Sequence, residues 1–179
     1  HLFYRYRISQ VMRKACLEAK KYGDIKTPVS ATLKRVVFIL NPAAHKRNAE
    51  ENFEKFCAPI LYLAGFNIEI VKTQSELHAI RYIEEELGEY PDALVIAGGD
   101  GTLSETITGL LRKAESDPKI PPVGILPVGQ FNQFSMMLFN SEKLPKNKVE
   151  EVQSMTNAAM AILKGTTAKK DVMRIQLIP

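Results

Sequence analysis

The most informative segment of this chain reads Ala97-Gly98-Gly99-Asp100-Gly101-Thr102. It directly follows the apolar run 93–96 and precedes a segment, 103–112, that has the apolar spacing of a helix. We expect the three glycines to adopt backbone angles that other residues avoid, so that backbone N–H groups can approach a ligand closely. The unpaired N–H groups and the dipole of the following helix would add to this attraction. The segment therefore predicts a strand, a turn and a helix N-terminus that bind phosphate.

Asp100 is the unusual member of this turn, because a carboxylate repels phosphate unless a cation lies between them. Its side chain could hold Mg²⁺ or orient a hydroxyl group. The alternative is a structural turn in which Asp100 or Thr102 caps the following helix. Capping does not require three glycines, so we favour the phosphate site.

The rest of the chain alternates between strand-like and helix-like segments. Short apolar or alternating runs predict strands at 35–40, 67–71, 94–97, 123–127 and 172–178. Apolar residues at helical spacing predict helices at 2–22, 50–63, 75–87, 103–112 and 148–163. This alternation is typical of an α/β fold, so we predict a Rossmann-like open, mainly parallel sheet with helices on both faces, preceded by a basic N-terminal helix.

Four of the predicted strands end in polar or glycine-rich turns. These turns lie at Asn41-Pro42, Thr73, 98–102 and 127–129. Ligands of open parallel sheets bind beyond the carboxyl ends of the strands. We therefore expect all four turns to lie at one edge of the sheet.

Composition excludes several other classes of protein. Cys16 and Cys57 have no partners at metal-ligand spacing, and the three histidines are scattered, which argues against a zinc site or a disulfide scaffold. There is no apolar run of the length that spans a membrane. The chain begins with His1 rather than Met, so we expect that an upstream segment was removed or left out.

The basic charge of the chain is concentrated near its start. Residues 1–35 contain nine Lys and Arg against Glu18 and Asp24, whereas acidic residues outnumber basic ones in the remainder. We therefore divide the chain into a basic helical extension and linker, 1–33, and an α/β domain, 34–179, to which the resemblance given below assigns nucleotide binding. The leading helix either lies on an anionic membrane surface, where each cation contributes about 1 kcal/mol, or packs on its own domain. Nucleic acid is not an expected partner.

Taken together, the turns resemble those of the diacylglycerol-kinase-type lipid kinases, which include sphingosine and ceramide kinases. Within that family the mitochondrial acylglycerol kinases are most similar. The resemblance covers nearly the whole chain and rests on segments 37–44, 58–61, 70–73, 97–103, 124–129, 164–165 and 171–172. NAD kinases carry a similar glycine loop and are a further hypothesis, but the turns at Asn41-Pro42 and 127–129 favour the lipid kinases.

The resemblance implies an ATP-dependent kinase that phosphorylates a hydroxyl group of an acylglycerol or diacylglycerol, with Mg²⁺ as cofactor. Asp100 would serve Mg²⁺ or phosphate chemistry as the catalytic residue. The other implied nucleotide-site residues are Asn41, Thr73, Gly98, Gly99, Gly101, Thr102, Glu105, Gly129 and Asn132. For Glu105 the alternative is an ordinary solvated position on a helix. The resemblance also implies a mitochondrial location, associated with the inner membrane.

Two departures from the family pattern lead to a second hypothesis. Gln130 and Gln133 stand where family members commonly carry Thr and Asp. The family also has a second, β-rich domain that supplies the expected general base, and we expect this chain to lack it and to be inactive alone. The alternative function is therefore a catalytically inactive structural or assembly subunit of a mitochondrial membrane protein complex. The resemblance gives this role a precedent, because mitochondrial acylglycerol kinases also take part in an inner-membrane protein import complex.

Overall fold

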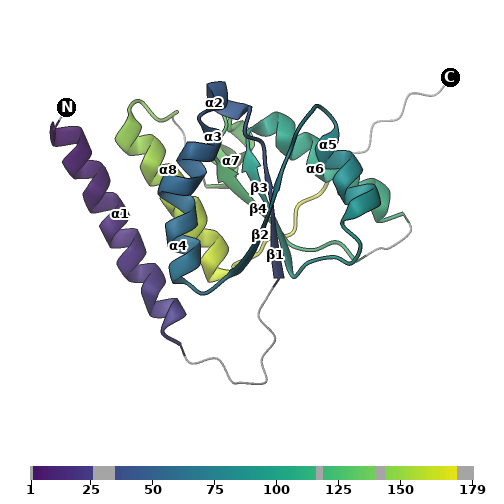
Figure 1. Ribbon diagram of the computed structural model, residues 1–179, viewed down its shortest axis with the longest axis horizontal. Helices are drawn as coiled ribbons and strands as arrows, with labels where there is room; N and C mark the ends of the chain where they lie inside the picture. The colour runs from purple at the N-terminus through teal and green to yellow at the C-terminus, as the bar shows by residue number, and fades with distance from the viewer. Residues whose placement is uncertain (1, 26–34, 116–118, 140–143, 173–179) are drawn as a thin grey trace.

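The computed structural model describes residues 2–25, 35–115, 119–139 and 144–172 (Figure 1). Within these segments four parallel strands form one sheet in the order β2-β1-β3-β4. The strands are β1 Arg35–Leu40, β2 Asn67–Lys72, β3 Ala93–Gly98 and β4 Val123–Pro127. The predicted open parallel sheet is confirmed. The further strand predicted at 172–178 lies outside the described residues except for Val172, and so does the predicted linker 26–33.

The helices alternate with the strands along the chain. Their bounds are α1 Leu2–Gly23, α2 Ala44–Arg47, α3 Ala49–Asn52, α4 Ala58–Leu63, α5 His78–Arg81, α6 Asp100–Lys113, α7 Gln133–Leu138 and α8 Lys148–Lys164, with π-helical turns η1 Phe53–Cys57 and η2 Tyr82–Glu86. Short helices α2 and α7 were not predicted. Both follow strands at the carboxyl edge of the sheet, which is the upper side in Figure 1.

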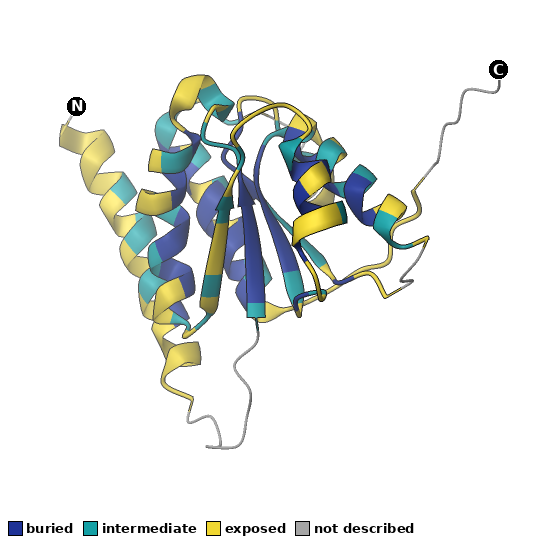
Figure 2. Ribbon diagram, turned by 45° about the vertical axis from the view of Figure 1, so that its right-hand side comes forward, coloured by how far each residue is buried: buried dark blue, intermediate teal, exposed yellow. Residues whose placement is uncertain are grey.

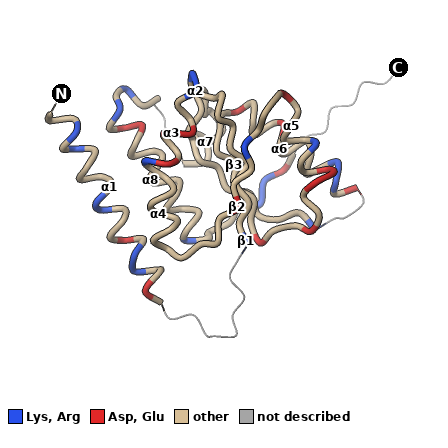
Figure 3. Tube along the Cα trace, in the orientation of Figure 1, with Lys and Arg blue, Asp and Glu red and all other residues tan. Residues whose placement is uncertain are grey.

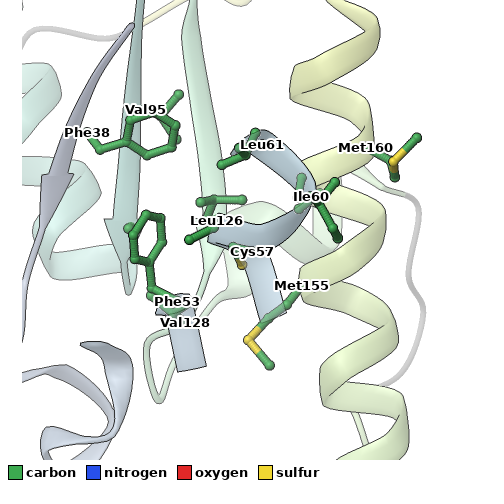
Figure 4. Close-up of a cluster of buried hydrophobic side chains, with 14 of the residues drawn as sticks. Phe38, Phe53, Cys57, Ile60, Leu61, Val95, Leu126, Val128, Met155 and Met160 are labelled. Carbon is green, nitrogen blue, oxygen red and sulfur yellow. The ribbon is translucent and has the colours of Figure 1, made fainter. Parts of the chain in front are cut away.

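The sheet is covered on both faces, as predicted. Helices α4 and α8 lie on one face, and α5 and α6 lie on the other (Figure 1). Strands β1 and β3 are buried along nearly their whole length, which is why they read as continuous apolar runs, whereas edge strand β2 is largely exposed (Figure 2). The larger core cluster fills the space between the sheet, α4 and α8, and Phe38, Phe53 and Met155 lie within it (Figure 4).

Two predicted helices are divided or shortened. The helix at 50–63, for which a kink or a division at Pro59 was expected, contains a π-helical turn that leads into α4, with Pro59 in the first turn of α4, where its missing N–H is not needed. The helix predicted at 75–87 begins only at His78, because Leu77 has a left-handed backbone with φ of 60°. The apolar spacing placed Leu77 on the same side of this helix as Ile80 and Ile83, but the Leu77 side chain is exposed whereas the other two are buried.

The N-terminal helix packs on the body of the protein through one face. Ala15 and Ala19 are buried against α4 and α8, and Glu18 forms an ion pair with Lys164 at 3.0 Å. The opposite face of α1 is exposed and carries a series of cations (Figure 3). Packing on its own domain, the second alternative for this helix, is therefore observed. In the described part of the chain, no helix is both long and apolar enough to cross a membrane.

Helix α8 should depend measurably on its N-cap. The Asn147 side chain accepts hydrogen bonds from the backbone N–H groups of Val149 and Glu150 at 3.0 and 3.1 Å. We expect Asn147→Ala to lower the free energy of unfolding by about 1 kcal/mol, measured by urea denaturation. The matched control is Asn157→Ala at an exposed position inside the same helix, which should be neutral or slightly stabilising because Ala is the better helix former. Equal destabilisation by both changes would contradict the capping role.

Candidate phosphate-binding site

The predicted turns meet at the carboxyl edge of the sheet. Strand pairing places Leu40 opposite both Lys72 and Ala97, and Gly98 opposite Pro127. The residues that follow these positions therefore lie side by side, and the backbone N–H of Thr73 donates to the Leu40 carbonyl at 2.8 Å. The sequence-based expectation that the strand-end turns converge is correct.

The glycine loop is packed directly against the turn that follows β4. The Gly129 N–H donates to the Gly98 carbonyl at 3.2 Å, and a Cβ atom on Gly129 would lie 2.3 Å from the Cα atom of Gly99. A Cβ atom on Gly99 would lie 2.8 Å from the Phe131 carbonyl oxygen. The two backbones can approach this closely only because neither glycine has a side chain.

The reason predicted for the three glycines was wrong. Gly98, Gly99 and Gly101 all lie outside the left-handed region, and Gly99 has φ of −102°. Lack of space explains two of them, because Gly98 and Gly99 are closely surrounded by other atoms. Gly101 is open, since outside its own helix and chain neighbours no atom lies within 4 Å of where its Cβ would be. The loop therefore presents backbone, without side chains, at the start of α6.

Asp100 has structural partners that the sequence did not indicate. Its carboxylate accepts hydrogen bonds from the backbone N–H groups of Gln133 at 2.9 Å and Phe134 at 3.2 Å, which are the first residues of α7. Its own N–H donates to the Phe131 carbonyl at 3.0 Å. The expected structural alternative, capping of the helix that follows the loop, was wrong, since no side chain caps α6. Asp100 caps α7 instead and joins the two loops.

Thr102 and Asn41 form a second connection across the site. The Asn41 side-chain amide donates to the buried Thr102 hydroxyl at 3.0 Å, while its carbonyl oxygen accepts from the backbone N–H of Ala43 at 3.0 Å. Asn41 thus fixes the turn after β1 to the first turn of α6. Both residues were predicted for the site, and the structure brings them into direct contact.

Asn132 leaves one polar atom without a partner. Its side-chain amide donates to the Gly129 carbonyl at 2.8 Å, but its carbonyl oxygen Oδ1 is buried and has no hydrogen-bond partner. A buried acceptor of this kind is rare unless water or a ligand donates to it. Gln130, the first departure from the family pattern, has an exposed side chain.

The remaining two predicted residues are less closely tied to the loop. Thr73 is half-buried at the end of β2, and the preceding Lys72 is hydrogen-bonded to Glu50, which raises the pKa of its ammonium group. Glu105 lies one turn into α6 with a half-buried side chain. In the described part of the chain, no hydrogen bond joins Glu105 to the other predicted site residues.

Sequence reasoning missed the basic turn at α2. His45, Lys46 and Arg47 have φ values of 52°, 54° and 70°, so three consecutive residues with side chains adopt the left-handed conformation. This conformation costs about 1–2 kcal/mol per residue. Such strain is concentrated at functional sites. His45 Nδ1 lies 3.3 Å from the Gly129 carbonyl oxygen, and Lys46 and Arg47 are exposed. The signal in the sequence was the run of three basic residues directly after the Asn41 turn.

Among the described residues, no group of three or more His, Cys, Asp or Glu side chains could hold a metal ion by itself. Mg²⁺ does not need such a cage, because it commonly binds one or two carboxylates together with the phosphates of a substrate. The Asp100 carboxylate has lone pairs beyond the two that accept from α7. The donor set therefore fits a magnesium ion that a nucleotide brings with it.

The fold and this site define a class: open α/β domains with a glycine-rich loop at the carboxyl edge, where ligands of such sheets bind. A family model of the diacylglycerol kinase catalytic domain matches residues 35–175. The chain belongs to the diacylglycerol kinase catalytic domain family.

Individual relatives agree with this assignment. The chain is 39% identical to mitochondrial acylglycerol kinase of Mus musculus, and the match covers 98% of this chain and 40% of that protein. It is 30% identical to sphingosine kinase 1 of Arabidopsis thaliana, and that match covers 79% of this chain and 28% of the relative. A crystal structure of a diacylglycerol kinase from Bacillus anthracis superimposes with a TM-score of 0.51 at 28% identity, covering 72% of this chain and 41% of that one. The chain thus spans about 40% of the length of these acylglycerol kinases.

Proposed function

We propose that this chain is the ATP-binding part of a Mg²⁺-dependent lipid kinase that phosphorylates a hydroxyl group of an acylglycerol or diacylglycerol. The main support is the convergence of the glycine loop, the β4–α7 turn and the basic α2 turn at one edge of the sheet. The names of the acylglycerol kinase relatives suggest the acceptor and a mitochondrial location. Since the chain spans about 40% of those proteins, the activity of the whole protein is part of the proposal.

The triphosphate would lie over the start of α6. The helix dipole and the N–H groups of the first turn attract anions there, and the open Gly101 position leaves the backbone accessible. Lys46 and Arg47 would add two positive charges from the opposite side of the site. Phosphoryl transfer depends chiefly on such positioning and charge stabilisation.

Asp100 would have a double role. Its hydrogen bonds to α7 hold the carboxylate in place, and its remaining lone pairs would bind Mg²⁺ together with the nucleotide phosphates. When bound, the metal would neutralise charge on the transferred phosphate. The unpartnered Asn132 oxygen would accept a hydrogen bond from a nucleotide hydroxyl or an ordered water. Asn41, Thr73 and Glu105 would line the same site.

The exposed face of α1 would contact an anionic membrane surface. Its cations stand at exposed positions along the helix (Figure 3), so they are available to lipid head groups. This contact would hold the domain close to the lipid substrate. No observation on the described residues favours the non-catalytic structural subunit over the kinase.

Titration of Mg-ATP by calorimetry tests the proposed nucleotide site. We expect the unmodified chain to bind, and Asp100→Asn to bind about tenfold more weakly or worse, because replacing a charged ligand removes roughly 1.5–3 kcal/mol. Gly99→Ala should also weaken binding, since its new Cβ meets the Phe131 carbonyl oxygen. The matched control is Asp92→Asn, because Asp92 lies beside Arg35 at the opposite edge of the sheet.

Absent binding, or the same affinity in all four proteins, would contradict the proposal. Because Asp100 also caps α7, circular dichroism and thermal unfolding should accompany each titration. A folded Asp100→Asn protein with weakened binding is the supporting result.

A further inference from the structure

Three hydrogen bonds meet at the backbone of Gly129. Its N–H donates to the Gly98 carbonyl at 3.2 Å, and its carbonyl oxygen lies 2.8 Å from the side-chain amide nitrogen of Asn132 and 3.3 Å from His45 Nδ1. A carbonyl oxygen has two lone pairs, so these two side chains use both of them. Gly129 therefore joins three segments that are far apart in the sequence: the α2 turn, the glycine loop and the turn that follows β4.

The contact with Gly129 fixes the position of the imidazole proton of His45. A carbonyl oxygen can only accept a hydrogen bond, so Nδ1 must be the ring nitrogen that carries the proton. His78 is in the opposite state, because its Nδ1 accepts a hydrogen bond from the backbone N–H of Gln74 at 2.9 Å. When both rings are neutral, His45 therefore has its proton on Nδ1 and His78 has its proton on Nε2.

The backbone at His45 needs a contact of this kind. His45 has φ of 52° and ψ of 48°, Lys46 has φ of 54° and ψ of 37°, and Arg47 has φ of 70°. Residues other than glycine normally enter the left-handed region singly, so no local preference supports a run of three. Such a turn persists only where the surrounding structure holds it.

Two side chains hold the turn against the rest of the site. Local hydrogen bonds, such as that from the Asn48 N–H to the His45 carbonyl at 3.0 Å, would form wherever the turn lies relative to the glycine loop. Asn41 attaches the start of the turn, because its side chain donates to Thr102. Further along the turn His45 makes the connection, and its hydrogen bond to Gly129 joins positions 84 residues apart. His45 thus fixes the middle of the turn.

The two cations of the turn follow His45 directly. Lys46 and Arg47 are exposed, and neither forms an ion pair with another described residue. Because they continue the left-handed backbone of His45, a change of backbone at His45 would turn both side chains in another direction. A cation that is already held in place binds an anion more tightly than one that must first be ordered.

We propose that His45 is a positioning residue for the phosphate-binding site. By donating from Nδ1 to the Gly129 carbonyl, it holds the α2 turn in the conformation that keeps Lys46 and Arg47 beside the glycine loop. The proposal rests on the proposed function, because the ligand of these two cations is the triphosphate. The contact joins two loops of this chain, so it does not depend on what covers the carboxyl edge of the sheet.

Nitrogen NMR tests the contact without any nucleotide. In long-range proton–nitrogen correlation spectra at alkaline pH, where imidazole rings are neutral, we expect the proton of His45 on Nδ1 and that of His78 on Nε2. His78 is the matched comparison within the same protein, and the variant His45→Asn assigns the signals. A His45 ring with its proton on Nε2 would overturn the proposal, because that tautomer cannot donate to Gly129.

Calorimetric titration with Mg-ATP tests the role at the phosphates. His45→Ala removes the donor and disfavours the left-handed backbone, so it should bind about tenfold more weakly than the unmodified chain. His45→Asn should bind within about threefold of the unmodified chain, because the Asn amide nitrogen can donate from the place of Nδ1 and Asn tolerates this backbone. Circular dichroism and thermal unfolding establish that both variants are folded.

A double-mutant cycle separates positioning from a general effect on the fold. Lys46→Ala should weaken Mg-ATP binding about fivefold in the unmodified chain but less than about twofold in the His45→Ala background, where the lysine is no longer held in place. A residue that only stabilised the fold would leave the effect of Lys46→Ala unchanged. In the His45→Asn background the fivefold effect should return.

Three binding results would overturn the positioning role. They are an unchanged affinity of His45→Ala, a loss in His45→Asn as large as that in His45→Ala, and an equal effect of Lys46→Ala in all backgrounds. Failure of the proposed function looks different, because the unmodified chain would then not bind Mg-ATP while His45 still carried its proton on Nδ1. That combination would overturn the role at the phosphates and leave the contact between the two loops established.

Discussion

Gly129→Ala is expected to lower the free energy of unfolding by about 3 kcal/mol, at the upper end of the usual cost of overpacking. The new Cβ would lie 2.3 Å from the Cα atom and 2.4 Å from the nitrogen of Gly99, both backbone atoms that no rotamer change can move. Relief requires the β4–α7 turn to separate from the glycine loop. The hydrogen bond from the Gly129 N–H to Gly98 and the contacts of Asp100 with α7 would then weaken as well. Urea denaturation followed by circular dichroism measures the loss.

Gly101→Ala is the matched control for this prediction. It lies in the same loop, but no atom lies within 4 Å of its added Cβ, and its backbone is helical. Ala at such a position should stabilise the fold by about 0.5 kcal/mol through a less flexible unfolded chain. Mg-ATP binding should fall in both variants, in Gly129→Ala because the loops separate and in Gly101→Ala because a methyl group occupies space proposed for phosphate. If Gly129→Ala were as stable as the unmodified chain, the close packing of the two loops would be wrong.

Phe38→Ala should cost about 3–5 kcal/mol of stability. Phe38 lies on the central strand β1, is fully buried, and packs against Phe53 with ring centroids 5.8 Å apart (Figure 4). Removing the ring leaves a cavity between the sheet and the helical layer that cannot collapse without moving the strand. Against a typical total of roughly 5–15 kcal/mol, the loss would leave a considerable part of the chain unfolded on heating. Thermal and urea unfolding measure it.

Phe3→Ala provides the comparison for the same chemical change. Phe3 is 66% exposed on α1, so its truncation should change stability by no more than about 0.5 kcal/mol. Similar losses for Phe38→Ala and Phe3→Ala would show that the core is not where the structure places it.

The order of strands and helices could be predicted because it depends on local patterns. The runs that became β1 and β3 are apolar along nearly their whole length and include the β-branched residues Val and Ile, which indicates strands buried on both faces. Once the strands are parallel, their carboxyl ends must share an edge, so the site containing Asn41, Thr73 and the glycine loop followed from the sequence. Leu77 shows the limit of periodicity: its spacing fitted the apolar side of a helix predicted from residue 75, but its backbone is left-handed and the helix begins only at His78.

The partners within the site could not be predicted in the same way. Asp100 binds the first residues of α7, more than thirty positions further along the chain, and α7 is too short to be stable or recognisable without that cap. The left-handed turn at His45, Lys46 and Arg47 costs energy locally and persists only because the surrounding structure holds it. The backbone preferences of these three residues therefore disfavour the conformation that places their cations at the site.

The sequence by itself determined the α/β class, the family and the glycine loop as the centre of the candidate site, because strand and helix patterns and the spacing of turns are properties of short segments. Only the tertiary structure decided what the glycines and Asp100 do. Gly99 and Gly129 allow the contact between two backbones, and Asp100 caps α7. The sequence does not show these roles because the contacts join loops that are distant in the chain. The loops become neighbours only when the parallel sheet brings the ends of β3 and β4 together.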